Sequence, residues 1–286
     1  MVDVSRAKHF LFSNARILER QLFAFHFEGG SAAAAARSLR AYQNPDGGYG
    51  NGLEPDKRTP LSQPQDCEIA LHTLDAIGLM RGDYVMPVLD WLETITTPEG
   101  GVPFSLPTAN DYPHAPWWGV KEANPPADLN PTAAIAGLVL KHGGQHAWLG
   151  PASDYCFTAI AASASTHFHE LACTTLFLAH TPDQSRARPL MDAILHRVAQ
   201  PGVVAMDPDA TGYVQKPLDF APRPNSPLRP VFADAEMALH LDHLAARQQD
   251  DGGWPITWDA ISPGVELEWR GRRTLDALLT LRAYGR

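Results

Sequence analysis

The stretch "QQDDGGWPITW" at residues 248–258 decides the fold, because it separates two amphipathic segments of the chain. A related stretch, "YQNPDGGYGNG", occupies residues 42–52, and a looser copy, "TPEGGVPFS", occupies residues 97–105. Each copy places a glycine pair before an apolar residue. Glycine adopts the positive φ that a sharp helix exit requires, and the apolar residue can pack back on the helix. The three stretches therefore predict three helix ends of the same design.

In the segments before and after these turns, apolar residues recur at helical spacing. The alternation of apolar and polar residues that is typical of strands is almost absent. Residues 88–95 and 190–198 each carry one apolar face, which predicts helices with one buried side. Other segments are apolar on most sides and are expected inside the protein: residues 67–79, 131–140, 170–179 and 235–241. The two kinds tend to alternate with a period of roughly 50 residues, which is typical of stacked helical hairpins.

The run from Gln249 to Trp254 resembles the repeats of the terpenoid cyclase and protein prenyltransferase superfamily, which carry a Gln, a short gap and Gly-x-Trp. Gln43 to Tyr49 is a second copy, with Tyr in place of Trp. The resemblance covers residues 31–286 and implies an all-α fold, an α/α toroid. In this fold an inner barrel of parallel helices lies within an outer helical ring, here with five or six hairpins. Residues 1–286 would form a single domain, with residues 1–30 as an N-terminal helical extension.

The net charge and the cysteine content limit the partners and the cellular location that we expect for this protein. The 286 residues carry a formal charge of -9, so we expect no nucleic acid as a partner. The resemblance implies a hydrophobic small-molecule substrate. Three scattered cysteines indicate reduced thiols and a cytoplasmic location. No segment reaches the ~20 apolar residues of a membrane span. The oligomeric state does not follow from the sequence.

Acidic residues recur at the expected starts of the inner helices, near residues 67, 235 and 267. The pattern acid-x-Glu appears three times, and looser versions of the opening are Asp128-Leu129-Asn130 and His169-Glu170. One polar side chain is enough to cap a helix, and parallel helices would bring the additional carboxylates into one cavity, where crowding raises their pKa values. The predicted catalytic group is Glu236, Asp234, Glu68, Asp66, Glu268, His169 and Glu170. We expect Glu236 to donate the proton, and Arg58, Arg229 or Arg270 to offset the negative charge.

The resemblance also bears on chemistry. Class II terpene cyclases protonate their substrate with an Asp-x-Asp-Asp motif, which this chain lacks; Asp234-Ala235-Glu236 is the nearest equivalent by position and Asp207-Pro208-Asp209 by letters. The diphosphate-binding motifs are absent too, so a neutral polyene or epoxide fits better than a diphosphate. His169 and Cys173 have the spacing of metal ligands on one helix, but no Cys-x-x-Cys accompanies them. We predict no metal and no cofactor, with zinc or magnesium as the alternative.

Aromatic residues in loops and at helix starts are the third group of candidates. The long proline-rich stretches 103–131 and 212–230 are typical of lids over a site. Aromatic faces stabilise carbocations and also stack on sugar rings. The predicted substrate-binding residues are Trp117, Trp118, Tyr112, Tyr213, Trp258 and Trp269.

Three functions remain open from the sequence. The first is a stand-alone enzyme of the terpene cyclase type, a lyase or isomerase that starts cyclisation or isomerisation of an isoprenoid-like substrate by protonation. The second is a glycan hydrolase or lyase with paired carboxylates and Trp platforms. The third is a non-catalytic toroid that binds a peptide or a lipid.

Overall fold

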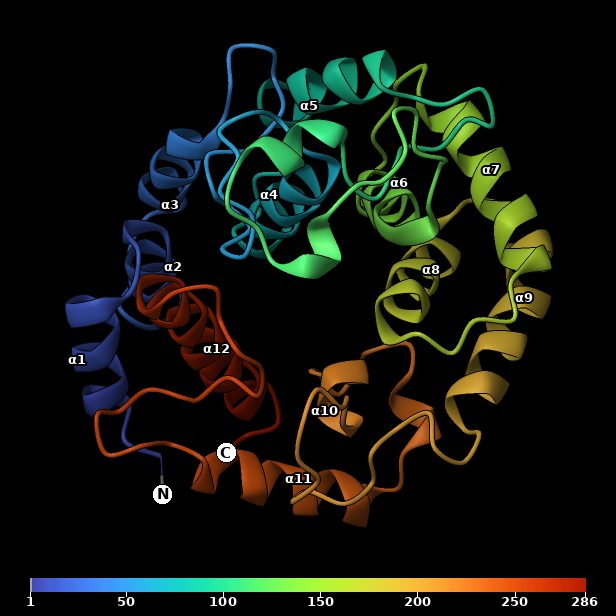
Figure 1. Cartoon of the computed structure of the whole chain (residues 1–286). Coiled ribbons are helices and arrows are strands. Elements are labelled where there is room, and N and C mark those ends of the chain that lie inside the picture. The colour runs from blue at the N-terminus through green and yellow to red at the C-terminus, as the bar shows by residue number, and fades with distance from the viewer. Residues whose placement is uncertain (1) are drawn as a thin grey trace. The chain divides into compact units, whose positions relative to one another are not determined.

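The computed structural model describes residues 2–286, whose regular secondary structure is helical, with long loops between some of the helices (Figure 1). Within them there is no strand, only three isolated β-bridges. The predicted all-α class is therefore confirmed. The α-helices are α1 (Val4–Asn14), α2 (Ile17–Phe27), α3 (Ala32–Leu39), α4 (Pro64–Ala76), α5 (Gly82–Thr94), α6 (Leu129–Lys141), α7 (Leu149–Ala162), α8 (Phe168–His180), α9 (Gln184–Val198), α10 (Pro217–Phe220), α11 (Asp234–Ala246) and α12 (Pro263–Ala283).

The helices group into two compact units. Unit 2 spans Ala36–Ile194, and unit 1 joins the N-terminal residues up to Ala35 with Leu195–Arg286. Each unit has its own buried core. The expected closure of all hairpins into one toroidal domain stays a prediction.

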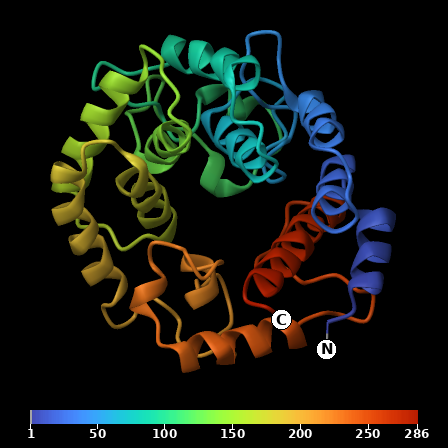
Figure 2. The ribbon, with the colours of Figure 1, turned by 180° about the vertical axis from the view of Figure 1, so that it is seen from behind.

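Unit 2 is built around α6, which packs against α4, α7 and α8. Every residue of α6 from Pro131 to Val139 is buried, because the sequence there is apolar on all sides. Gly137 allows close packing, since a Cβ at this position would lie 2.7 Å from the backbone of α8 at Leu176. Helices α5 and α7 flank this group on one side (Figure 2). Residues 131–140 thus occupy the interior, as predicted.

Unit 1 is built around α12, which packs against α1, α2 and α11. Gly271 brings α12 close to the connection between α1 and α2: a Cβ on it would lie 2.6 Å from the Cβ of Ala15. Helix α11 differs from the expectation that residues 235–241 are buried on all sides. It buries only Met237, His240 and Leu241, while Leu239 is 52% exposed. That expectation was wrong, because α11 precedes a glycine turn and so occupies the one-sided position of the hairpin.

The three glycine turns share one geometry. Gly47, Gly100 and Gly252 have φ angles of 95°, 98° and 92°, which confirms the predicted positive φ. In each turn the N–H of this glycine donates to the carbonyl three residues earlier, at 2.9–3.0 Å. An alanine Cβ at any of the three would lie within 2.6 Å of a carbonyl oxygen on another helix, so each turn is pressed against its neighbour.

The residue after each glycine pair anchors the turn to the next long helix. The N–H of Val102 donates to the Thr132 hydroxyl, and the N–H of Trp254 donates to the Thr274 hydroxyl, both at 2.9 Å. The N–H of Tyr49 donates to the thiol sulfur of Cys67 at 3.3 Å. The repeated motif therefore fixes both the exit from one helix and the position of the next.

Candidate functional site

The N-terminal ends of α4, α6 and α8 meet in unit 2 and form a polar cluster. The Gln65 Nε2 group donates to Asn130 Oδ1 at 2.6 Å, and Cys173 Sγ lies 3.5 Å from the same oxygen. Cys173 Sγ also lies 3.8 Å from Glu68 Oε1. Asn130 thus connects three helix starts. We name this group the helix-start cluster; its members are Gln65, Glu68, Asp128, Asn130, Glu170 and Cys173.

Asp128 is the carboxyl in this cluster whose pKa is raised. Burial is the main cause and the charge of Glu170 adds to it, while the hydrogen bond from the Asn130 N–H and the charge of His167 act in the opposite direction. The Asn130 N–H donates to Asp128 Oδ1 at 2.8 Å, so Asp128 also caps α6. Burial raises the pKa of Tyr155 on α7, and the charges of Asp128 and Glu170 contribute. Two carboxylates and a phenol therefore share one partly buried region.

Glu68 contacts the cluster through Cys173 and is partly exposed. Its side chain is 14% exposed, and His72 Nε2, on the next turn of α4, lies 3.5 Å from Glu68 Oε1. Burial raises the pKa of the Cys173 thiol, and the charge of Glu68 adds to the effect, so Cys173 remains a neutral donor. The cluster thus offers a third carboxylate, with a histidine beside it.

Asp66, although adjacent in sequence, belongs to a separate buried ion pair. Its Oδ2 lies 2.9 Å from Lys57 Nζ, and its Oδ1 accepts the N–H of Glu54 at 2.9 Å. Lys57 is fully buried, and its Nζ lies 4.3 Å from the centroid of the Trp118 ring. These contacts give Asp66 a structural role at the start of α4.

The proline-rich stretch after α5 folds over this ion pair as an ordered loop. Gln63 accepts the N–H of Leu106 at 2.9 Å and donates to the hydroxyl of Thr108 at 2.8 Å. The rings of Phe104 and Trp118 stack with centroids 4.8 Å apart.

The other two candidate aromatics of this loop face solvent. Trp117 is 50% exposed and Tyr112 is 37% exposed, whereas Trp118 is buried. The predicted lid aromatics therefore divide into one packing residue and two surface residues.

In unit 1 the candidate acids lie at the starts of α11 and α12. Glu236 Oε2 accepts the N–H of Ala233 at 2.8 Å, so Glu236 caps its own helix. Asp234 is exposed and pairs with Arg229; the expected offset of crowded carboxylates within one cavity stays a prediction. Glu268 lies in the second turn of α12, and its convergence with Glu68 on one cavity stays a prediction.

The structure also places the remaining candidates His169, Glu170 and Arg270. His169 lies on α8 with its ring centroid 5.5 Å from that of His167, and the adjacent Glu170 accepts a hydrogen bond from the Ser163 hydroxyl. Arg270 is engaged elsewhere: it pairs with Asp251 at 2.8 Å. Arg270 therefore serves the glycine turn.

The aromatic candidates of unit 1 lie together. The rings of Tyr213 and Trp258 have centroids 6.0 Å apart, and those of Trp258 and Trp269 have centroids 5.1 Å apart. Both pairs are edge-to-face. The sequence predicted these three residues as substrate-binding, and the structure shows that they form one aromatic cluster.

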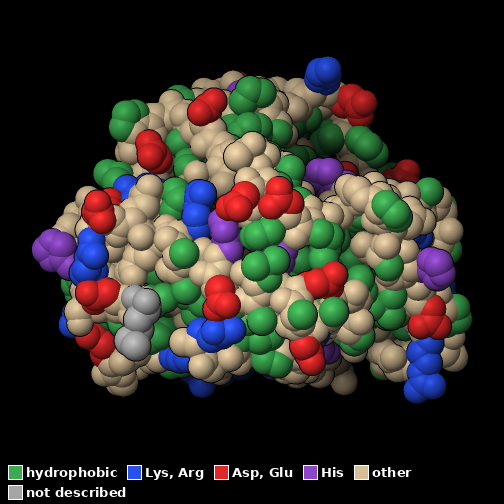
Figure 3. Space-filling model, turned by 90° about the horizontal axis from the view of Figure 1, so that it is seen from below, with side chains coloured by type: hydrophobic (Ala, Val, Ile, Leu, Met, Phe, Trp, Pro, Cys, Tyr) green, Lys and Arg blue, Asp and Glu red, His purple; other side chains and the backbone are tan. Residues whose placement is uncertain are grey.

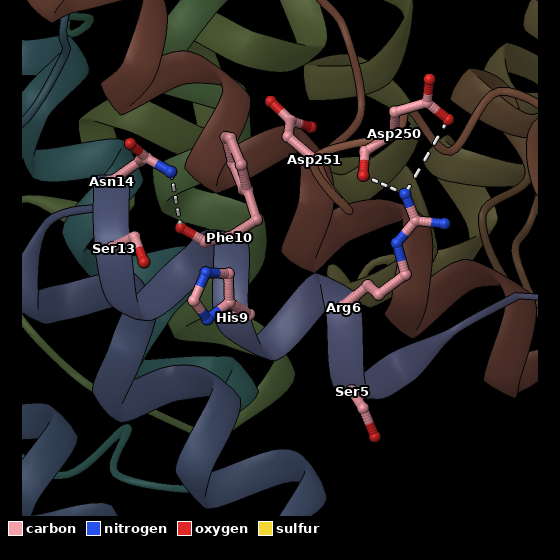
Figure 4. A pocket seen from close by; sticks show the side chains of 8 residues that line it. All are labelled: Ser5, Arg6, His9, Phe10, Ser13, Asn14, Asp250 and Asp251. Carbon is pink, nitrogen blue, oxygen red and sulfur yellow. Dashed lines mark hydrogen bonds and ion pairs between the residues drawn. The ribbon is translucent and has the colours of Figure 1, made fainter.

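A groove in unit 1 lies between α1 and the glycine turn that follows α11 (Figure 4). Its lining consists of Ser5, Arg6, His9, Phe10, Ser13, Asn14, Asp250 and Asp251. Both of its carboxylates have cationic neighbours: Arg6 lies 3.9 Å from Asp250, and Arg270 pairs with Asp251. The groove therefore marks the junction of the turn with α1, and its charges are already paired.

Within residues 2–286, no three side chains of His, Cys, Asp or Glu are arranged to hold a metal ion. None of the helices in this part of the chain has the length and apolarity needed to cross a bilayer. On the face drawn in Figure 3, acidic and basic side chains are interspersed.

Comparison with known proteins finds a structure with a similar fold and gives no information on chemistry. No family model and no curated protein matches the chain. The crystal structure of a protein from Actinoplanes is similar, with a TM-score of 0.62, over 99% of this chain and 98% of that one. The two sequences are 17% identical, so the similarity shows a shared fold alone.

Sequence reasoning missed three members of the helix-start cluster as site residues. Gln65 carries no motif that singles it out, and Asp128 and Asn130 belong only to a loose version of the acidic opening. Their grouping depends on how α4, α6 and α8 pack, which spacing along one segment does not reveal. The signal available in the sequence was the recurrence of polar residues just before each apolar helix.

Proposed function

We propose that the chain is an enzyme that protonates a neutral, isoprenoid-like substrate and so starts its isomerisation or cyclisation. The observation that carries this proposal is the raised pKa of Asp128, a carboxyl that is half-buried beside Glu170 at adjoining helix starts. A general acid must keep its proton until the substrate is in place, and burial beside a like charge favours the protonated form.

We assign the acid to Asp128 rather than to Glu236 because of their hydrogen bonds. Glu236 accepts the N–H of Ala233 at its own helix start and lies on a helix with one exposed side. Asp128 lies at the start of α6, whose residues from Pro131 to Val139 are buried, and its surroundings favour the neutral carboxyl. An apolar helix behind the acid also suits an apolar substrate.

The proposed reaction needs a proton donor and a proton acceptor. The Asp128 carboxyl transfers its proton to an alkene carbon, which leaves a carbocation on the substrate and a carboxylate on Asp128. The Glu68 carboxylate, with His72 beside it, accepts a proton from the cation as the new double bond forms. Solvent returns one proton to Asp128 and takes one from Glu68, so the product is an isomer of the substrate and no co-reactant is consumed.

Solvent deuterium provides the test. Wild-type protein is incubated in D₂O with squalene and with farnesol, and the products are analysed by mass spectrometry. We expect an isomeric product that carries one deuterium at carbon. Asp128→Asn keeps the capping oxygen but cannot donate a carboxyl proton, and it should lower turnover by about 10²–10⁴-fold.

The matched control is Asp209→Asn, since Asp209 belongs to the acid pair that resembles the cyclase motif by letters and is exposed in a loop of unit 1. This variant should turn over like wild type. Cleavage of chromogenic glycosides by wild-type protein would favour the glycan hydrolase alternative. Full activity of Asp128→Asn would disprove the assignment of the acid.

A further inference from the structure

The aromatic cluster of unit 1 contains two indole N–H groups that are buried without an acceptor. Neither Trp258 Nε1 nor Trp269 Nε1 has a hydrogen-bond partner within residues 2–286. The third indole of this unit behaves differently: Trp254 Nε1 donates to the carbonyl of Leu244 at 2.8 Å. The two unpaired donors lie on adjoining rings, with centroids 5.1 Å apart.

Two unpaired donors side by side are unusual in a folded protein. Most buried polar groups are hydrogen-bonded, and each one left unpaired destabilises the fold by about 1–3 kcal/mol. A weak contact of an N–H with a neighbouring ring face replaces only part of that loss. Trp258 and Trp269 therefore retain donor capacity that folding alone does not use.

A cation lies next to the same rings. The Arg272 guanidinium carbon is 5.6 Å from the centroid of the Trp269 ring, one helical turn further along α12. Arg272 forms no ion pair with a carboxylate among the described residues, although its charge acts on the carboxyl of Asp276 one turn further along α12; Arg273 lies 3.8 Å from Asp219. Tyr213 completes the cluster from a loop and is 56% exposed, so one side of the group is open to solvent.

We propose that Tyr213, Trp258, Trp269 and Arg272 form a ligand site in unit 1 for a flat apolar molecule that bears a carboxylate. The ring faces match an apolar planar body. The two indole N–H groups and the guanidinium supply donors and positive charge for the carboxylate oxygens. This site is separate from the helix-start cluster and stands independently of the function proposed for it.

Binding of 2-naphthoate to the full chain, measured by isothermal titration calorimetry, tests the site. Wild-type protein should bind one molecule saturably. Trp258→Phe and Trp269→Phe keep an aromatic ring and remove one N–H each, and each should raise the Kd roughly 10-fold or more. Arg272→Gln should weaken binding by a similar factor. The probe 2-naphthalenemethanol, which lacks the carboxylate, should bind at least about tenfold more weakly than 2-naphthoate.

Two controls separate binding from folding. Trp117→Phe changes an exposed indole of unit 2 and should leave the Kd unchanged. In the absence of probe, Trp254→Phe removes a satisfied hydrogen bond and should lower the Tm by roughly 2–4 °C, whereas Trp258→Phe and Trp269→Phe should not. Absence of saturable heat, equal binding of the alcohol, or unchanged affinity in both Trp variants would overturn the proposal.

Discussion

Replacing Gly100 by alanine tests the turn geometry on which the helical repeat depends. Gly100 has a φ of 98°, and a Cβ at this position would lie 2.6 Å from the carbonyl oxygen of Pro151 on α7 and 2.9 Å from the carbonyl carbon. The left-handed backbone conformation alone should lower the free energy of unfolding of the alanine variant by about 1–2 kcal/mol. Forcing a methyl group against a backbone carbonyl adds about 1–3 kcal/mol. The total expected loss is about 2–5 kcal/mol.

Gly143→Ala is the matched control within the same unit. Gly143 also has a positive φ, of 66°, but nothing lies within 4 Å of its Cβ position. It should therefore lose only the conformational part, about 1–2 kcal/mol. Urea unfolding followed by far-UV circular dichroism measures both variants against wild type. Equal losses in the two variants, or no loss in Gly100→Ala, would refute the claim that the glycine turn is held against α7.

Three further substitutions probe other contacts by the same unfolding assay. Lys57→Met leaves Asp66 as a buried carboxylate without its cation, and it should cost about 3–5 kcal/mol; a loss below 1 kcal/mol would contradict the buried ion pair. Thr274→Val removes the acceptor of the Trp254 N–H and should cost about 1–3 kcal/mol, and wild-type stability would show that the turn is not anchored there. Glu236→Ala removes a helix cap and should cost about 0.5–2 kcal/mol without loss of turnover; an inactive, fully stable variant would restore Glu236 as the catalytic acid.

The sequence predicted well the features that depend on local chemistry. A positive φ at Gly47, Gly100 and Gly252 follows from glycine pairs at helix ends, because few other residues adopt that conformation. The interior position of α6 follows from a run that is apolar on all sides. These signals lie within single segments, so no knowledge of packing was needed.

The errors and omissions depend on contacts between segments. Residues 235–241 form too short an apolar run to distinguish a buried helix from a one-sided one, and α11 proved one-sided. The raised pKa of Asp128 depends on its burial and on Glu170, which only the packing of α6 with α8 brings near. The pairing of Trp258 with Trp269 likewise requires the loop before α12 to fold back on that helix.

The pKa of Asp128 in the folded protein is the most direct test of the proposed acid. Titration of ¹³C-labelled aspartate carboxyls by NMR, with Asp128 assigned by its loss in Asp128→Asn, measures this value. We expect a pKa above the ordinary value of 3.8, and a lower pKa in Glu170→Gln because the neighbouring negative charge is removed. A pKa at or below 3.8 in the wild-type protein, or one that Glu170→Gln leaves unchanged, would contradict the proposed general acid.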